Sequence, residues 1–188
     1  GLPGMIRHGV VIHTPHYINQ YGPFTPVQDE LAAAWKQFDV QGAITSKLGL
    51  PTKVVNDAEM HGAGVIAGRG LEVVFTLGTG LGSAVFDGGV LTPHLELSHA
   101  TVRGGIWYDH WIGEAERRRV GTAIWNRRVR LTIERWYPVF RWDRLYLGGG
   151  NSRLISQTTS ARLGDDVVIV PNAAGLLGGE RIWSISHL

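Results

Sequence analysis

The sequence predicts an α/β protein, because short apolar runs alternate with longer segments of helical pattern along most of its 188 residues. Alternation of this kind is typical of layered folds in which helices cover a sheet. Three segments suited to ligands, 56–57, 78–82 and 148–150, each follow a run that is expected to be a strand. Ligand sites of open α/β sheets lie at the carboxyl ends of strands. The fold class therefore also predicts where the functional site lies.

The first third of the chain is expected to hold a hairpin, helices and one buried strand. We predict a strand or hairpin over 5–13, a loop over 14–25, a helix over 27–38, a helical turn over 44–48, a buried strand over 53–55 and a helix over 58–67. The first of these helices has Asp29 and Glu30 near its start, where the helix dipole favours negative charge. The last contains Gly62 and Gly64, which would permit close packing.

The rest of the chain is expected to alternate strands with helices. We predict strands over 71–77 and 83–86 around a turn at 78–82, a hairpin turn at 87–89, a long helix over 114–137, strands over 145–147 and 167–170, and a final helix over 173–183. The long helix is expected to end before Pro138, because the residue that precedes a proline disfavours the helical conformation.

The composition excludes several kinds of site. With no cysteine, the chain can form neither a disulfide nor a thiolate metal site, which fits a reducing cytoplasm. No apolar run approaches the roughly 18 residues of a membrane span. The formal net charge is +2, yet 117–153 holds ten arginines against Glu134 and Asp143. Such a basic stretch suits an anionic partner, although a solvated, partly salt-bridged helix face is the plainer interpretation.

The stretch "LGTGLGS" carries the pattern of a phosphate-binding loop. Gly78, Gly80 and Gly82 would let the backbone turn tightly and present N–H groups to phosphate oxygens. Thr79 and Ser83 could add hydroxyl donors. A strand rather than a helix follows, so the match to the dinucleotide-binding fingerprint is poor. A plain glycine-rich hairpin is the alternative.

The pair Asn56-Asp57 ends an apolar run and opens a helix. A carboxylate in this position is often only an N-cap. The functional interpretation makes Asp57 a general base that deprotonates a substrate hydroxyl. Phosphoryl transfer depends mostly on positioning and charge neutralisation, so one carboxylate is sufficient.

Two further groups of polar residues are candidates for the site. In "ELSH", Glu96 and His99 are three residues apart and could hold sugar hydroxyls in one pocket, although a surface hydrogen-bonding pair is the plainer interpretation. As a metal site the pair offers too few ligands. Glu114 and Glu116 in "GEAERRRVG" fall in a first helical turn, and the helix dipole alone would explain them.

These segments, taken in order, resemble those of the ROK family of sugar kinases and sugar-responsive repressors. The resemblance is carried by "GLPG" with "HGVV", "VVNDAEMHGAG", "TLGTGLGSAVFDGGVL", "ELSH", "LYLGGGNS" and "PNAAGLLGGE". Each motif alone is weak, but six in the right order cover nearly the whole chain. The resemblance implies an actin-like, RNase H-like ATPase fold of two lobes. We expect residues 1–58 to be the remainder of the first lobe and 59–188 to form the second.

The resemblance also implies roles for individual residues. Asp57 would be the catalytic base, Asn56 a sugar ligand, and Glu96 and His99 contacts of sugar hydroxyls. Glu116 matches a third acidic sugar ligand. The remaining expected contacts belong to the loops: Gly78, Thr79 and Gly80 beside the transferred phosphate, and Gly149 and Gly150 beside the nucleotide.

The departures from the family pattern are informative. Most members carry a cysteine-rich zinc segment after the Glu-x-Gly-His motif, whereas this chain has no cysteine, so no zinc is expected. Its "EAERRR" resembles a segment of the zinc-free polyphosphate glucokinases. Ser98 replaces the glycine of the motif. The family's first phosphate loop, which precedes the Gly-x-Pro-Gly turn, has no counterpart here, so we expect an N-terminally truncated chain with little activity alone.

The function implied is that of a hexose kinase of the glucokinase type. It would transfer a phosphoryl group from ATP or polyphosphate, with Mg²⁺, to the 6-hydroxyl of glucose in the cytoplasm. The arginine-rich stretch favours polyphosphate, and a homodimer is expected by resemblance, with no nucleic-acid or membrane partner. The alternatives are a sugar-responsive transcriptional repressor and a sugar-binding protein without catalysis.

Overall fold

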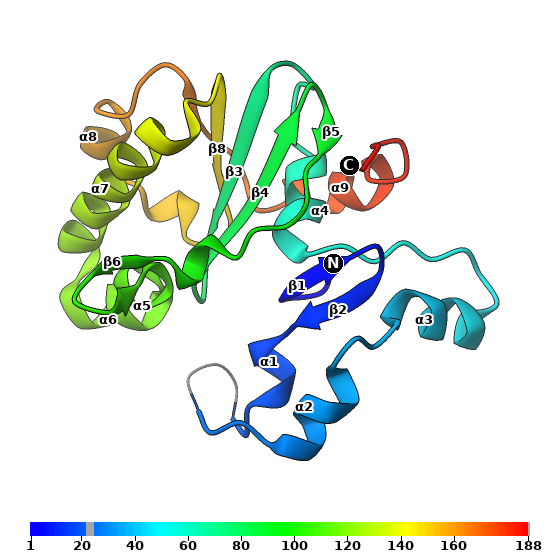
Figure 1. Cartoon of the computed structure of the whole chain (residues 1–188). Coiled ribbons are helices and arrows are strands. Elements are labelled where there is room, and N and C mark those ends of the chain that lie inside the picture. The colour runs from blue at the N-terminus through cyan, green and yellow to red at the C-terminus, as the bar shows by residue number, and fades with distance from the viewer. Residues whose placement is uncertain (22–24, 188) are drawn as a thin grey trace.

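A mixed sheet forms the centre of the larger part of the molecule (Figure 1). The computed structural model describes residues 1–21 and 25–187, and of His16 only the backbone. The strand order is β5 (Val90–Leu91), β4 (Leu81–Asp87), β3 (Leu71–Leu77), β8 (Arg144–Gly148) and β9 (Val167–Ile169). Strands β3, β8 and β9 run parallel, whereas β4 is antiparallel to both its neighbours. The ends of β3 and β8 therefore meet at one edge of the sheet.

Helices cover both faces of this sheet, as the alternation of its side chains requires. On one face Val73, Phe75 and Leu77 pack with residues of α5 (Tyr108–Ile112) and α7 (Thr122–Phe140). On the other face Val74 and Tyr146 pack with residues next to α4 (Asp57–Ala63) and α9 (Ala174–Arg181). The layered α/β fold expected from the sequence is confirmed.

Glycines bring α4 close to its neighbours, as predicted for Gly62 and Gly64. A Cβ atom on Gly62 would lie 2.6 Å from the Phe86 ring, and one on Gly64 would lie 2.1 Å from the carbonyl oxygen of Ala174. On the partner helix, a Cβ on Gly178 would lie 1.7 Å from the Met60 carbonyl. Helices α4 and α9 thus touch through their backbones, which fixes the start of α4 against the sheet.

The N-terminal part is a smaller layer below the sheet in Figure 1. It consists of the hairpin β1 (Met5–Arg7) and β2 (Val10–His13), followed by α1 (Pro15–Ile18), α2 (Asp29–Trp35) and α3 (Val40–Leu48). It has its own apolar cluster, made of Ile6, Val11, Val40 and Val54 with Leu2, Trp35 and Ile44. The connection to the sheet runs through residues 49–56 into α4.

Two predictions for this part are corrected by the structure. Segment 53–55 is not a strand, although Val54 and Val55 are buried. Their backbone makes single contacts: the N–H of Val54 donates to the Gln41 side chain (2.9 Å), and the carbonyl of Val55 accepts from the N–H of Leu2 (2.9 Å). A strand forms only where a neighbour offers a ladder of hydrogen bonds. The predicted loop at 14–25 contains the short helix α1, started by Pro15, and its residues 22–24 lie outside the described residues.

The predicted long helix at 114–137 is also wrong. Two helices replace it, α6 (Glu114–Val120) and α7, separated by Gly121 at φ +83°. Helix α7 then continues through Pro138 to Phe140. The proline removes the bond to the carbonyl of Glu134, and both residues are exposed, so water can hydrate that carbonyl. Helix α6 packs at the sheet edge where β3 ends, because the break at Gly121 redirects the chain.

The remaining elements connect these layers. They are the 3₁₀ turns η1 (Leu97–His99) and η2 (Ser152–Leu154), the hairpin β6 (Thr101–Arg103) and β7 (Ile106–Trp107), and α8 (Gln157–Ser160). The other predicted strands and helices occur with ends shifted by a few residues. Within residues 1–21 and 25–187, no helix is both long and apolar enough to cross a membrane.

Candidate active site

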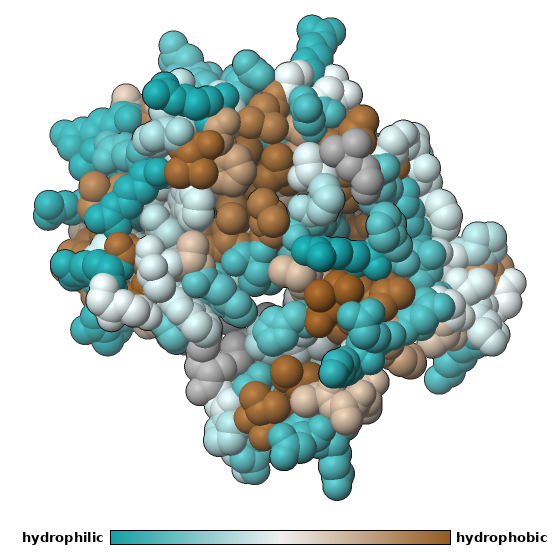
Figure 2. Space-filling view, viewed as in Figure 1, coloured by the Kyte–Doolittle hydropathy of each residue, from teal (hydrophilic) through white to brown (hydrophobic). Residues whose placement is uncertain are grey.

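A cavity of about 960 Å³ lies between the N-terminal part and the edge of the sheet where β3 and β8 end. Figure 2 shows the molecule hollowed where these two parts meet. Its wall comes from the ends of the β1–β2 hairpin, α1 and the residues after it, the start of α4, the loop after β3, the stretch 94–99, the segment 107–109, the loop after β8 and the start of α9. The cavity is thus where the parallel strands predicted it.

The structure at the start of α4 assigns the helix cap, which the sequence left open between a capping role and a catalytic role for the pair Asn56-Asp57. Asn56 is the N-cap: its Oδ1 accepts from the N–H of Ala58 (2.7 Å), and Glu59 accepts from the N–H of Asn56 (2.8 Å) in a capping box. The Asn56 amide also donates to the carbonyl of Gly4 (2.8 Å). Asp57 Oδ1 also accepts from the N–H of Ala58 (3.0 Å), but because Asn56 is the cap, Asp57 stays exposed at the cavity.

The loop at 78–80 is built as an anion-binding turn. Its carbonyls are occupied, since the N–H of Glu114 donates to the oxygens of Gly78 (3.1 Å) and Thr79 (3.2 Å). Within the described part of the chain, the N–H groups of Thr79 and Gly80 donate to no protein acceptor. Backbone N–H groups that point away from the protein at a tight turn favour phosphate oxygens.

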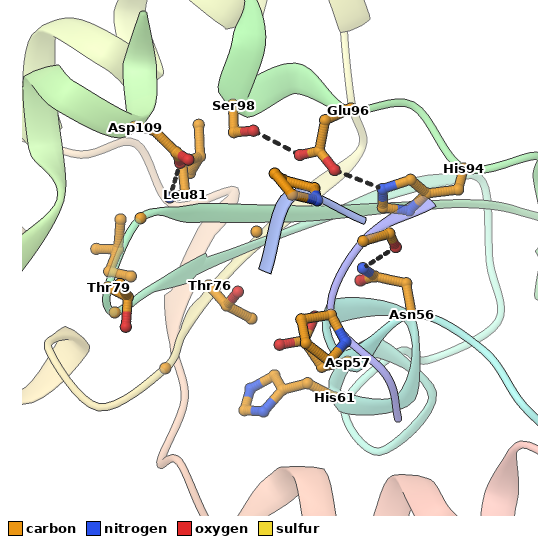
Figure 3. A pocket seen from close by; sticks show the side chains of 18 of the residues that line it. Asn56, Asp57, His61, Thr76, Thr79, Leu81, His94, Glu96, Ser98 and Asp109 are labelled. Carbon is orange, nitrogen blue, oxygen red and sulfur yellow. Dashed lines mark hydrogen bonds and ion pairs between the residues drawn. The ribbon is translucent and has the colours of Figure 1, made fainter. Parts of the chain in front are cut away.

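Asp109 holds this loop from behind, and the sequence reasoning missed it. Its Oδ1 accepts from the N–H of Leu81 (2.8 Å), and a Cβ on Gly80 would lie 2.2 Å from the same oxygen. Figure 3 shows this contact beside Thr79. Glycine at position 80 is thus required by the close approach of a carboxylate. Nothing local in the sequence pairs positions 80 and 109.

The loop after β8 lies against the end of β3. Gly149 adopts φ +83°, and a Cβ there would lie 2.5 Å from the carbonyl oxygen of Leu77. The Asn151 side chain donates to the carbonyl of Gly78 (3.3 Å) and to Glu114 (3.0 Å). The two glycine loops are therefore joined at the cavity wall, as parallel pairing of β3 with β8 implies.

On the opposite wall, Glu96 is held in a polar network (Figure 3). Its carboxylate accepts from the Ser98 hydroxyl (2.5 Å) and pairs with His94 Nε2 (3.6 Å). Burial would raise the pKa of Glu96, but the contacts with His94 and Ser98 outweigh it and lower the pKa. The His99 ring lies 4.6 Å from the Trp107 ring. A fixed, ionised carboxylate and an imidazole thus face the cavity together.

His61 is a second residue that the sequence reasoning missed. It lies one helical turn after Asp57, is 5% exposed, and its Nε2 finds no hydrogen-bond partner in the described part of the chain. A Cβ on Gly148 would lie 2.1 Å from this nitrogen. Burial lowers the pKa of His61, although Asp57 opposes the shift, so the ring is neutral at physiological pH.

Glu116 is not brought to the cavity. Its carboxylate accepts from Arg119 (2.6 Å) on α6 and from Arg128 (2.6 Å) on α7, and Arg128 also lies over the Trp111 ring. The Arg119 and Arg128 contacts, set against some burial, lower the pKa of Glu116 to about 2. The predicted sugar-binding role of Glu116 therefore has no support in the geometry, because neighbouring arginines occupy both of its oxygens.

The other predicted site residues all line this one cavity. They are Asn56, Asp57, Gly78, Thr79, Gly80, Glu96, His99, Gly149 and Gly150. His94, Asp109 and His61 join them without having been predicted. Within the described ranges, no three histidine, aspartate or glutamate side chains are grouped so that they could hold a metal ion.

Comparison with known proteins was made for sequence and for structure. No family model matches the chain. The polyphosphate glucokinase of Mycobacterium tuberculosis is 28% identical over 191 residues, which cover 94% of this chain. The chain spans 65% of the length of that relative.

Solved structures agree with this similarity. The inorganic polyphosphate/ATP-glucomannokinase of Arthrobacter sp. strain KM superposes with a TM-score of 0.73 at 28% identity, over 97% of this chain and 72% of the other. A ROK family glucokinase of Streptomyces griseus, in complex with glucose and AMPPNP, has a TM-score of 0.64 at 15% identity, over 95% of this chain and 78% of the other, which shows the fold alone. The resemblance that the motifs predict is thus confirmed: the chain is similar to polyphosphate glucokinases in sequence, and it shares the actin-like α/β fold of the ROK sugar kinases.

Proposed function

We propose that this chain is part of a hexose kinase that transfers a phosphoryl group from polyphosphate or ATP to the 6-hydroxyl of glucose. One observation carries the proposal. An exposed carboxylate next to the helix cap, Asp57, shares a cavity with two glycine loops whose geometry suits phosphate. The similarity to polyphosphate glucokinases supports the same reaction class.

In this mechanism Asp57 is the general base. Its carboxylate accepts the proton of the sugar hydroxyl as that oxygen attacks phosphorus, and the bond from phosphorus to the donor oxygen breaks. The chain positions Asp57 at the first turn of α4, where the capping box of Asn56 and Glu59 fixes the backbone. Asp57 is exposed at the cavity there, so a sugar hydroxyl can reach its carboxylate.

The proposed sugar ligands are Asn56, Glu96 and His99. Glu96 is ionised and held by Ser98, so it can accept hydrogen bonds from sugar hydroxyls in one geometry. The Asn56 amide makes a bond at each end, which leaves it one further donor position and one further acceptor position. Polar groups from the start of α4 and from the stretch 96–99 would orient a ring with several hydroxyls toward Asp57.

The proposed phosphate ligands are the backbone N–H groups of Thr79 and Gly80 and the loop Gly149-Gly150. A phosphoryl group in transfer gains from such preorganised donors because they need no reorientation during the reaction. Mg²⁺ fits this donor set, since it is usually carried by substrate phosphates with one or two carboxylates rather than by an all-protein cage. The carboxylate that lies against the loop is Asp109. Bound Mg²⁺ would neutralise phosphate charge.

We further propose the division into two lobes near residue 58. The apolar clusters support it: one is drawn from residues 2–54, and the two that flank the sheet are drawn from residues 55–185. The cavity lies between these groups. Substrate-induced closure of two lobes on such a cavity would exclude water from the transferred phosphate.

The test is an assay of the full-length protein for glucose 6-phosphate, with ATP and polyphosphate offered separately. The variant is Asp57→Asn, which keeps the shape and removes the base. Asp29→Asn is the matched control, because Asp29 is also exposed in the first turn of a helix, away from the cavity. We expect Asp57→Asn to lower kcat by about 10²–10⁴-fold with Asp29→Asn unchanged.

The outcomes separate the candidate functions. Turnover that Asp57→Asn abolishes would establish a kinase with Asp57 as its base, and the preferred donor would decide between ATP and polyphosphate. Glucose binding without turnover would refute the kinase and favour the sugar-binding protein or the repressor. Turnover that survives in Asp57→Asn would keep the kinase and reject the base.

A further inference from the structure

A buried histidine that the proposed mechanism does not use connects the two sides of the sugar site. His94 is 4% exposed and lies between β5 and η1. Its Nδ1 lies 3.3 Å from Glu59 Oε1, and its Nε2 lies 3.6 Å from Glu96 Oε2. Neither nitrogen has the alignment of a hydrogen bond, and both contacts are ion pairs when the imidazole is protonated. One imidazole therefore spans two carboxylates that come from different elements.

Each of these carboxylates is tied to a functional segment. Glu59 accepts from the N–H of Asn56 (2.8 Å), which places it in the capping box beside Asp57. Glu96 accepts from the Ser98 hydroxyl (2.5 Å), at the start of η1. A continuous path of polar contacts thus runs from the start of α4, through His94, to the stretch that carries the proposed sugar ligand. Figure 3 shows the Glu96 end of this path.

The charge of His94 decides whether the two carboxylates attract the imidazole between them or only repel each other. Two carboxylates in one buried site repel each other unless a cation lies between them. Burial alone would lower the pKa of His94, but the contacts with Glu59 and Glu96 outweigh it and raise the pKa to about 9. The other titratable groups near the two carboxylates are His99 and His13 beside Glu96, and His187 beside Glu59. At neutral pH the imidazole is charged and neutralises its neighbours.

We propose that His94 is a positioning residue for the sugar, an imidazolium that holds the Glu96 carboxylate at a set place relative to the start of α4. This inference rests on the proposed function, because the role of Glu96 as a sugar ligand is part of that function. With the imidazolium in place, the sugar ligand and the base keep one separation. Without it, Glu96 is free to turn or to take up a proton, so sugar affinity falls while the chemistry at Asp57 is retained.

The first test is steady-state kinetics of the full-length protein with His94→Asn, which keeps a polar side chain but carries no charge. His8→Asn is the matched control, because His8 is exposed in the β1–β2 turn at φ 49°, a conformation that asparagine tolerates. We expect His94→Asn to raise KM for glucose about tenfold or more, with kcat within about threefold. KM for the phosphate donor should not change. A glucose KM equal to that of the wild type would overturn the proposal.

The second test reads the charge directly and does not need turnover. The imidazole nitrogens of His94 are followed by ¹⁵N NMR as pH is raised, with His94→Asn used for assignment. We expect His94 to remain protonated above about pH 8, and KM for glucose in the wild type to rise as that proton is lost. A neutral His94 at pH 7 would overturn the proposal.

A further variant keeps the inference testable if His94→Asn does not fold. Glu59→Gln retains an oxygen for the capping box and removes one of the two charges beside His94. We expect it to lower both the titration midpoint of His94 and the pH at which KM for glucose begins to rise. If neither the titration midpoint of His94 nor that pH changes, the proposal is refuted.

The failure of this inference differs from the failure of the proposed function. If the wild-type protein neither binds nor phosphorylates glucose, the function fails and the role of His94 fails with it. If the wild type phosphorylates glucose and His94→Asn has the same KM, only the role of His94 is rejected.

Discussion

Helices α4 and α6 begin with the same local pattern and have different places in the molecule. Both are seven residues long and carry two acidic residues in the first turn, Asp57 and Glu59 in α4, Glu114 and Glu116 in α6. In α4 one acid faces the cavity and the other pairs with buried His94. In α6 both acids pair with arginines. The helix dipole explains acidic first turns in both, so it does not distinguish a site from a surface.

The difference arises from the cap and from the next turn of each helix. Helix α4 has a side-chain cap, Asn56, whereas the N-cap of α6 is Gly113, which offers none. In α6, arginines three and four residues further on reach back to the acids, as at Arg117 and Arg118. Helix α4 has no such partners at those positions, so Asp57 stays available to a ligand. Neighbours within one turn thus decide which acidic pattern remains reactive.

The largest expected difference between the helices is in stability. Glu59→Ala removes a buried partner of His94 and one half of the capping box, so we expect a loss of about 3 kcal/mol in the free energy of unfolding. Glu116→Ala removes a partly exposed cluster of ion pairs, in which the Glu116 side chain is 19% exposed, and should cost about 1 kcal/mol. Urea unfolding of both variants measures the difference. Equal costs would mean that the buried pair contributes no more than the exposed one.

The next comparison is between the glycines that end the two helices. A Cβ on Gly64, after α4, would lie 2.1 Å from the Ala174 carbonyl, and we expect Gly64→Ala to destabilise by about 2 kcal/mol through overpacking against α9. Gly121, after α6, has open space, but its φ of +83° and ψ of 155° form a backbone conformation that is essentially restricted to glycine, so Gly121→Ala should cost about 1–3 kcal/mol through backbone strain alone. Thermal unfolding of both variants measures the two costs. A negligible cost for Gly64→Ala would show that α9 yields easily.

The two clusters should respond to pH in opposite directions. The pKa of His94 is raised to about 9, so its contribution to stability is complete below the unfolded value of 6.5 and is lost as pH rises through 9. We expect a loss on the order of 2 kcal/mol between about pH 7 and pH 9.5. The pKa of Glu116 is lowered to about 2, so its smaller contribution is lost as pH falls from 4.5 through 2.

This pH dependence is checked by unfolding the wild type and His94→Asn at both alkaline and neutral pH. The three other histidines with shifted pKa values, His13, His61 and His187, have lowered ones, so they act below about pH 6.5 and do not obscure the alkaline loss. An alkaline loss of equal size in His94→Asn would show that another group is responsible.

The smallest effect is expected from the charge of Glu116 on activity. Because Glu116 does not line the cavity, Glu116→Gln should leave kcat and KM for glucose within about twofold of the wild type. The same assay that measures Asp57→Asn measures this variant. A large rise in KM for glucose would return Glu116 to the sugar site and would require α6 to move.

Much of the fold could be predicted from periodicity and from turn residues. The strands β3 and β8 follow from apolar runs ended by glycine, and the positions of both phosphate-type loops follow from those ends. The predictions that were wrong failed because the outcome depends on tertiary structure or on backbone conformation. The segment 53–55 has the composition of a strand but lacks a neighbour to pair with, and the helix over 114–137 breaks at Gly121, where a positive φ is preferred.

The sequence by itself determined the order of the motifs, the start of a helix at 56–57 and the turns of both glycine loops, because these depend on residues a few positions apart. Only the tertiary structure decided that His94 lies between Glu59 and Glu96, that Asp109 holds the loop at Gly80, and that arginines occupy Glu116. Such contacts join residues from different elements, and their chemistry depends on burial and on distance. Neither quantity can be read from local pattern, since both arise when the layers pack.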